Sequence, residues 1–154
     1  MIQEIKGDLI KGLEEGKVQA ILHCANCQKK MNSGVAKALR EKWPEVYEAD
    51  LNYVALPANR LGNITYAKVG EDKFVVNCYG QLRYGYDGER YVNYEGLYSS
   101  LNEAKIMLQF KRIKEVGFPY LMAACRAGGD WNIVKAMIES VFKNFNVTIF
   151  KLTE

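Results

Sequence analysis

Residues 18–24, Val-Gln-Ala-Ile-Leu-His-Cys, form a nearly continuous apolar run of strand length, and no other feature constrains the fold as strongly. A strand with one solvated face alternates apolar and polar residues, whereas a strand covered on both faces has an almost unbroken apolar sequence. Strands of the second kind lie in the middle of sheets. The run therefore predicts the central strand of a sheet that is covered on both sides.

Further strands and helices are expected on both sides of this run. Strands are expected over residues 2–5, 63–69, 73–79, 118–124 and 147–152, with a hairpin signal at residues 70–72. Helices are expected over residues 10–15, 33–43, 44–51, 94–115 and 130–144, the second with Ser33 as its N-cap and the third beginning at Pro44. This order predicts an α/β protein, a three-layer α/β/α sandwich on a mixed central sheet, formed by one domain over residues 1–154.

Charge and composition exclude several classes of protein. The chain has 21 Lys and Arg residues against 18 Asp and Glu residues, without a block of like charges, so no basic nucleic-acid arm is predicted. It lacks a run of eighteen apolar residues and a signal-like N-terminus, so we expect a cytoplasmic monomer that does not bind membranes. The cysteines stand in apolar or Gly/Ala-rich settings and are expected to be reduced thiols: Cys24, Cys27, Cys78 and Cys125.

Three polar or glycine-rich segments follow predicted strands, at residues 7–8, 23–34 and 123–130. Doubly wound sheets bind ligands outside the carboxyl ends of their strands, so these segments are the candidate site. The third can present backbone N–H groups and a helix N-terminus to a phosphate, or it is a tight connection in which Asp130 caps the helix. A P-loop is not predicted, because no Walker lysine follows, and G-x-G-x-x-G does not occur.

The second segment holds His23, the one histidine of the chain, next to a Cys-x-x-Cys pair. A zinc site needs a second ligand cluster, and the other two cysteines stand alone, so no metal site is predicted. His23 is either a structural residue at a strand end or, beside Asn26 at the mouth of the crevice, a group that transfers protons near neutral pH.

Four segments in this order resemble the macro domain family. They are Gly7-Asp8-Leu9, the Leu-His-Cys-Ala-Asn-Cys of residues 22–27, the Ser-Gly-Val-Ala of residues 33–36, and the Gly-Gly-Asp-Trp of residues 128–131. The likeness is greatest to the branch that contains phosphatases of ADP-ribose 1″-phosphate and terminal ADP-ribose glycohydrolases. The resemblance implies the macro domain fold, ADP-ribose or ADP-ribose 1″-phosphate as the ligand, and no cofactor. Nucleic acid would be a partner only if it were ADP-ribosylated.

The resemblance also implies a role for each matching residue. Asp8 would accept the adenine amine, or is simply a turn-forming residue, and Asn26 would hold the distal ribose, or caps its loop. Leu9 and Ile10 would line the adenine pocket, and Phe150 would lie against adenine unless it belongs to the core. Two backbone segments would enclose the diphosphate: Ser33, Gly34, Val35 and Ala36 on one side, and Cys125, Arg126, Ala127, Gly128 and Gly129 on the other.

Two departures from the family pattern bear on function. Members commonly begin the phosphate loop with Gly-x-Gly, whereas this chain has Ala-Ala-Cys at residues 123–125, which adds side chains where the backbone must approach the ligand. The glycohydrolase branch uses a lysine nucleophile shortly after the middle strand. Residues 77–81 contain no lysine, which argues against a covalent lysine mechanism.

The leading hypothesis is therefore hydrolysis of the phosphomonoester of ADP-ribose 1″-phosphate. His23 would protonate the leaving oxygen or position the phosphate, Asp130 would orient or deprotonate water, and Asn26 would fix the ribose. Two alternatives stay open. One is an ADP-ribosyl hydrolase that acts on modified protein or nucleic acid, and the other is a non-catalytic reader or sponge of ADP-ribose.

Overall fold

The structure is a computed structural model that describes residues 2–85, 87, 89–124 and 127–152. The strands are β1 (Ile2–Lys6), β2 (Ala20–Asn26), β3 (Ile64–Gly70), β4 (Lys73–Gln81), β5 (Glu115–Pro119) and β6 (Asn146–Lys151). The helices are α1 (Leu9–Glu14), α2 (Gly34–Lys42), α3 (Pro44–Leu51), α4 (Pro57–Arg60), α5 (Tyr94–Phe110) and α6 (Trp131–Val141). Strands and helices alternate along most of the chain, as the sequence predicts.

The strands form one mixed sheet in the order β1-β6-β5-β2-β4-β3. Neighbouring strands are parallel except for β3 and β4, which form the predicted antiparallel hairpin. At its tight turn Asp72 adopts the left-handed φ of 52° that such turns need. The strand β2, which includes residues 20–24 of the apolar run, lies between β4 and β5, and this central position explains why the run is apolar on both faces.

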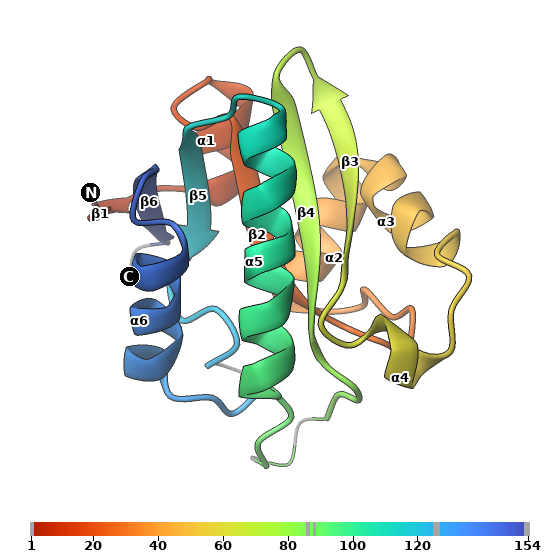
Figure 1. The fold of residues 1–154 in the computed structure, drawn as a ribbon. Coiled ribbons are helices and arrows are strands. Elements are labelled where there is room, and N and C mark those ends of the chain that lie inside the picture. Colours follow the sequence, from red (N-terminus) through yellow and green to blue (C-terminus); the bar gives the residue numbers. More distant parts are fainter. Residues whose placement is uncertain (1, 86, 88, 125–126, 153–154) are drawn as a thin grey trace.

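Helices cover both faces of the sheet, so the predicted three-layer α/β/α sandwich is confirmed. Figure 1 shows α5 and α6 in front of the sheet and α1, α2 and α3 behind it. On the α5 and α6 face, Leu97, Leu101 and Ile138 pack against Leu22 and Phe118. A second cluster on the other face joins residues of α1, α2 and α3 to the sheet, including Leu13, Leu39, Val46, Ile21 and Val75.

The prediction that the long helix runs to residue 115 is wrong, because α5 ends at Phe110. Arg112 adopts a left-handed φ of 62°, and the N–H of Ile113 donates to the Leu108 carbonyl at 2.9 Å. A left-handed residue followed by a bond back into the last turn is a common helix ending. Ile113 satisfies the helical spacing in sequence, yet it is buried in the connection to β5.

The strand predicted over residues 118–124 is also wrong in its bounds, because β5 ends at Pro119. Leu121 and Ala123 adopt left-handed φ values of 63° and 62°, and the N–H of Met122 donates to the Pro119 carbonyl at 3.1 Å. Residues 120–124 therefore form successive turns. Other boundaries differ less: β2 runs two residues further than predicted, to Asn26, and α6 ends three residues earlier, at Val141.

A membrane-spanning helix, which must be both long and apolar, is not found in the described part of the chain.

Candidate functional site

A cavity of about 310 Å³ opens at the carboxyl ends of β2, β4 and β5, whose final residues Asn26, Gln81 and Pro119 all line it. This is where doubly wound sheets bind ligands, and the volume is in the range of small-molecule sites. The remaining lining residues come from β2 and the segment after it, the loop after β4, and the turns after β5: His23, Cys24, Ala25, Lys30, Met31, Asn32, Ser33, Gly34, Val35, Ala36, Tyr84, Gly85, Tyr120, Leu121, Met122, Ala123 and Ala127.

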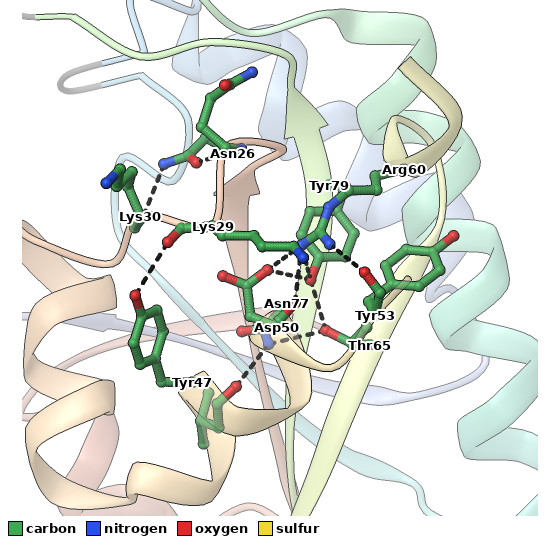
Figure 2. Close-up of polar contacts among 12 residues, drawn as sticks. Asn26, Lys29, Lys30, Tyr47, Asp50, Tyr53, Arg60, Thr65, Asn77 and Tyr79 are labelled. Carbon is green, nitrogen blue, oxygen red and sulfur yellow. Dashed lines mark hydrogen bonds and ion pairs between the residues drawn. The ribbon is translucent and has the colours of Figure 1, made fainter. Parts of the chain in front are cut away.

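Asn26 lines the cavity and also holds the loop that follows β2. Its Oδ1 accepts from the Gln28 N–H at 2.9 Å, and its Nδ2 donates to the Lys30 carbonyl at 2.9 Å. The Tyr47 hydroxyl donates to the Lys29 carbonyl at 3.1 Å, so α3 supports the same loop (Figure 2). Both ends of the Asn26 amide thus have partners in the loop. These bonds use one of the two N–H groups of Nδ2 and one of the two lone pairs of Oδ1, so the predicted contact with a ribose does not require either bond to break.

The first turn of α2, with its N-cap, lines the cavity at Ser33, Gly34, Val35 and Ala36, and the contact of this segment with a ligand stays a prediction. Ser33 occupies the predicted N-cap position but its side chain makes no capping hydrogen bond. Gly34 has a left-handed φ of 60°, which disfavours other residues there. The first N–H groups of a helix lack intrahelical partners and carry partial positive charge, so this part of the lining suits an anion.

Another part of the lining comes from the turns after β5 together with Ala127. The predicted phosphate loop lay further along, at residues 125–129. Of those residues, Ala127 lines the cavity, and its carbonyl accepts from the N–H groups of Tyr91 and Val92 at 2.6 and 3.0 Å. Cys125 and Arg126 lie outside the described residues. Sequence reasoning missed the turns because residues 120–123 were assigned to a strand.

Gly128 and Gly129 are not among the lining residues, and their lack of side chains serves packing between loops. Gly128 has a left-handed φ of 72°, and a Cβ there would lie 2.5 Å from the Glu89 carbonyl oxygen. A Cβ on Gly129 would lie 2.6 Å from the Ala123 carbonyl oxygen. These glycines let the segment before α6 pack against residues 89–92.

Asp8 and Asp130 both cap helices and neither is among the residues that line the cavity. Asp8 Oδ1 accepts from the Ile10 N–H at 2.8 Å at the start of α1, and Asp130 Oδ1 accepts from the Asn132 N–H at 2.9 Å at the start of α6. Each cap uses one carboxylate oxygen. The capping interpretation describes both residues here, while adenine recognition by Asp8 and water activation by Asp130 stay predictions.

Leu9, Ile10 and Phe150 belong to the core beneath α1. Leu9 is 7 % exposed and Phe150 is 4 % exposed, and Ile10 packs against the same cluster while half-buried. A Cβ on Gly117 would lie 2.8 Å from the Phe150 ring, which fills the space under α1. None of the three lines the cavity, so the core alternative describes Phe150.

Tyr84 and Tyr120 line the cavity but were not predicted as site residues. Tyr120 packs edge-to-face on Trp131 with 5.5 Å between ring centroids, and the Lys151 ammonium lies 4.6 Å from its ring centroid. Tyr84 lies in the aromatic loop that follows β4. Because β4 is parallel to β2, this loop leaves the same sheet edge, and that adjacency could have identified Tyr84.

His23 is 2 % exposed, and its Nε2 lies 2.5 Å from Asn77 Oδ1. Burial lowers the pKa of His23, and the hydrogen bond to Asn77 and the charge of Asp50 oppose that shift only in part. The ring is therefore neutral near pH 7, where a neutral imidazole accepts a proton more readily than it donates one.

The cysteines of the described chain are free thiols: Cys24, Cys27 and Cys78. Burial raises the pKa of Cys24 to about 12 and that of Cys27 to about 11, so neither is a thiolate near neutral pH. Across the described residues, no three side chains of the His, Cys, Asp and Glu types gather closely enough to hold a metal ion.

No protein-family model matches the sequence. The 17.5 kDa protein of the tk-vs intergenic region of Enterobacteria phage T4 is 28% identical over 153 residues, 97% of this chain and 95% of that protein. A solved structure from Bacteroides thetaiotaomicron is 25% identical with a TM-score of 0.80, over 99% of this chain and 100% of that one.

Two further structures are more distant in sequence. The macrodomain of Mycobacterium tuberculosis DarG is 19% identical with a TM-score of 0.78, over 97% of each chain. DarTG of Thermosipho africanus, solved in complex with ADP-ribose, is 16% identical with a TM-score of 0.75, over 97% of this chain and 41% of that one. At such identities the agreement in structure establishes the fold, and the described chain has the fold of a macrodomain.

Proposed function

We propose that the protein binds ADP-ribose or a close derivative in the cavity at the carboxyl ends of β2, β4 and β5. The observation that carries this proposal is that the first turn of α2 and the turns after β5 line one cavity. Support comes from the fold, which is shared with a structure solved in complex with ADP-ribose. The position also agrees with the general rule for ligands of doubly wound sheets.

The chemistry of the walls suits the parts of such a nucleotide. The N-terminus of α2 favours an anion such as the diphosphate, and Lys30 adds a cation to the lining. Tyr84, Tyr120 and Met122 supply aromatic and apolar surface of the kind that holds a nucleobase. The proposed ligand thus combines an anionic diphosphate and a nucleobase, and the cavity has a complementary surface for each.

Isothermal titration calorimetry with ADP-ribose, and with AMP for comparison, tests the proposal. Val35 lines the cavity and is 38 % exposed, so Val35→Glu places a carboxylate beside the diphosphate without disturbing the core. A charge pair of this kind costs on the order of 1 kcal/mol or more, so affinity should fall about tenfold. Val54→Glu, at a residue that is 94 % exposed and outside the lining, is the matched control. Failure of the wild-type protein to bind ADP-ribose would remove the proposal.

Hydrolysis at this site is the second candidate, and the presence of His23 in the cavity lining favours it. The reaction is either phosphate release from ADP-ribose 1″-phosphate or release of ADP-ribose from modified protein or nucleic acid. His23→Gln should reduce turnover on the order of 10²-fold while ADP-ribose still binds. If the wild-type protein binds ADP-ribose but hydrolyses neither substrate, binding alone is the function and the protein acts as a reader.

A further inference from the structure

A row of polar side chains crosses the sheet next to the cavity. The register of β2 on β4 pairs His23 with Asn77, and the register of β3 on β4 pairs Thr65 with Asn77. Directly paired residues project to the same face of a sheet, and Tyr79 follows Asn77 by two residues on that face. The row ends at Asp50 and Arg60, so that one hydrogen-bonded network connects His23 to a buried ion pair. Figure 2 shows the part of this network that runs from Asn77 to the ion pair.

The ion pair fixes the direction of the hydrogen bonds at its end of the row. Asp50 and Arg60 are both buried and form a salt bridge. The Tyr79 hydroxyl donates to Asp50 Oδ1 at 2.6 Å, and burial together with this bond raises the pKa of Tyr79, so the phenol keeps its proton. A hydroxyl has only one hydrogen, so the 2.8 Å contact between Thr65 Oγ1 and the Tyr79 oxygen requires Thr65 to be the donor.

The amide of Asn77 is oriented by two neighbours. Asn77 Nδ2 lies 3.0 Å from Thr65 Oγ1, whose own hydrogen points to Tyr79, and 3.2 Å from the Val46 carbonyl oxygen. A carbonyl oxygen only accepts, so a reversed amide would bring two acceptors together. Asn77 Oδ1 must therefore face His23, and the 2.5 Å contact with His23 Nε2 requires a hydrogen on that nitrogen.

With its hydrogen on Nε2, the neutral ring of His23 has a free lone pair on Nδ1. This atom forms no hydrogen bond with another described residue, and His23 is one of the residues that line the cavity. A hydroxyl group can donate to such a nitrogen. An ionised phosphate oxygen has no hydrogen to offer it.

We infer that His23 presents Nδ1 to the cavity as a hydrogen-bond acceptor for a hydroxyl group of the ligand, and that Asn77 and Thr65 are positioning residues that hold the ring in this state. The assignment of the ligand's hydroxyl rests on the proposed binding function, whereas the state of the ring does not. His23 would then select for sugar hydroxyl groups rather than for a phosphate.

The ring state is measured directly by long-range ¹H–¹⁵N NMR of the unliganded protein at pH 7.5. His23 is the chain's one histidine, so a protein without a histidine tag gives one set of ring signals. We expect a protonated, pyrrole-type Nε2 and an unprotonated, pyridine-type Nδ1. A proton on Nδ1, alone or together with one on Nε2, would overturn the inference.

Two variants test the positioning roles with the same signals. Asn77→Ala removes the acceptor for Nε2–H, and the Nε2–H form should give way to a mixture of the two neutral forms. Thr65→Val removes one of the two groups that orient the Asn77 amide but leaves the Val46 carbonyl. The Nε2–H form of His23 should therefore remain the major neutral form, with a smaller excess over the Nδ1–H form than in the wild type. Unchanged ring signals in a folded Asn77→Ala protein would refute the positioning role. If Asn77→Ala does not fold, the ratio of the two neutral forms in Thr65→Val is the test. A ratio equal to that of the wild type would then refute the positioning role.

Titration of the wild-type protein with ADP-ribose tests the ligand contact. We expect the Nδ1 signal to shift in proportion to the bound fraction measured by calorimetry. If ADP-ribose binds and the Nδ1 signal does not move, the hydroxyl contact is wrong while the proposed function stands. If ADP-ribose does not bind, the proposed function fails, and the ring state measured without ligand is unaffected.

Discussion

Replacing Asp50 by alanine should destabilise the protein strongly, because it leaves the Arg60 guanidinium buried without its counter-ion. Arg60 is 0 % exposed and Asp50 is 1 % exposed. Arg60 would keep its bonds to the Tyr53 carbonyl at 2.8 Å and the Asp50 carbonyl at 3.2 Å, which offer partial charges only. Its Nε already lacks a partner among the described residues. Removing one member of a buried pair typically costs about 3–5 kcal/mol.

For a chain of this length each kcal/mol lowers the melting temperature by about 2–4 °C, so the expected decrease is roughly 6–20 °C. Denaturant titration of Asp50→Ala gives the free energy of unfolding, and calorimetry gives the melting temperature. The double variant Asp50→Leu/Arg60→Met removes both charges and fills their volume, so it should be more stable than Asp50→Ala alone. A loss below about 1 kcal/mol in Asp50→Ala, or a double variant less stable than the single one, would refute this reasoning.

Three further predictions follow from the described contacts. Gly128→Ala should lose about 2 kcal/mol or more of unfolding free energy in denaturant titration, because its Cβ would meet the Glu89 carbonyl in a left-handed conformation. At pH 7.5 Cys78 should react with a thiol reagent only at the rate of unfolding, because its side chain is fully buried and burial raises its pKa, and rapid labelling of Cys78 in the native protein would contradict this. Because the folded pKa of His23 is lowered, stability should be constant above about pH 6.5 and decrease below it, as the unfolded state binds the proton more tightly. Melting curves at pH 5 and 7.5 should show this decrease in the wild type and a smaller one in His23→Gln.

Much of the fold could be predicted from hydrophobic patterns alone. Residues 18–24 identified the central strand, and the hairpin turn before β4 was marked by Gly70 and its polar neighbours. The predicted boundaries were wrong where the hydrophobic periodicity continues although the backbone conformation changes. Ile113 continues the helical spacing beyond the real end of α5, and Leu121 and Ala123 adopt left-handed φ values that only glycine would have announced in the sequence.

The candidate site was predictable only where a local sequence pattern marks its residues. Residues that line the cavity from the first turn of α2 follow the polar loop after β2, and Ser33 and Gly34 marked them. The network of Asp50, Arg60 and Asn77 joins residues far apart in sequence, and no local pattern reveals such a connection. Asp8 and Phe150 were chosen by resemblance, and their present contacts are a helix cap and the core.

The most direct test of the central proposal is a titration of ¹⁵N-labelled protein with ADP-ribose, followed by backbone amide shifts. We expect saturable shifts concentrated in two segments that line the cavity, the first turn of α2 at residues 33–36 and the turns after β5 at residues 120–123. Shifts confined to other parts of the protein, or no saturable shifts at all, would contradict the proposal that this cavity binds ADP-ribose.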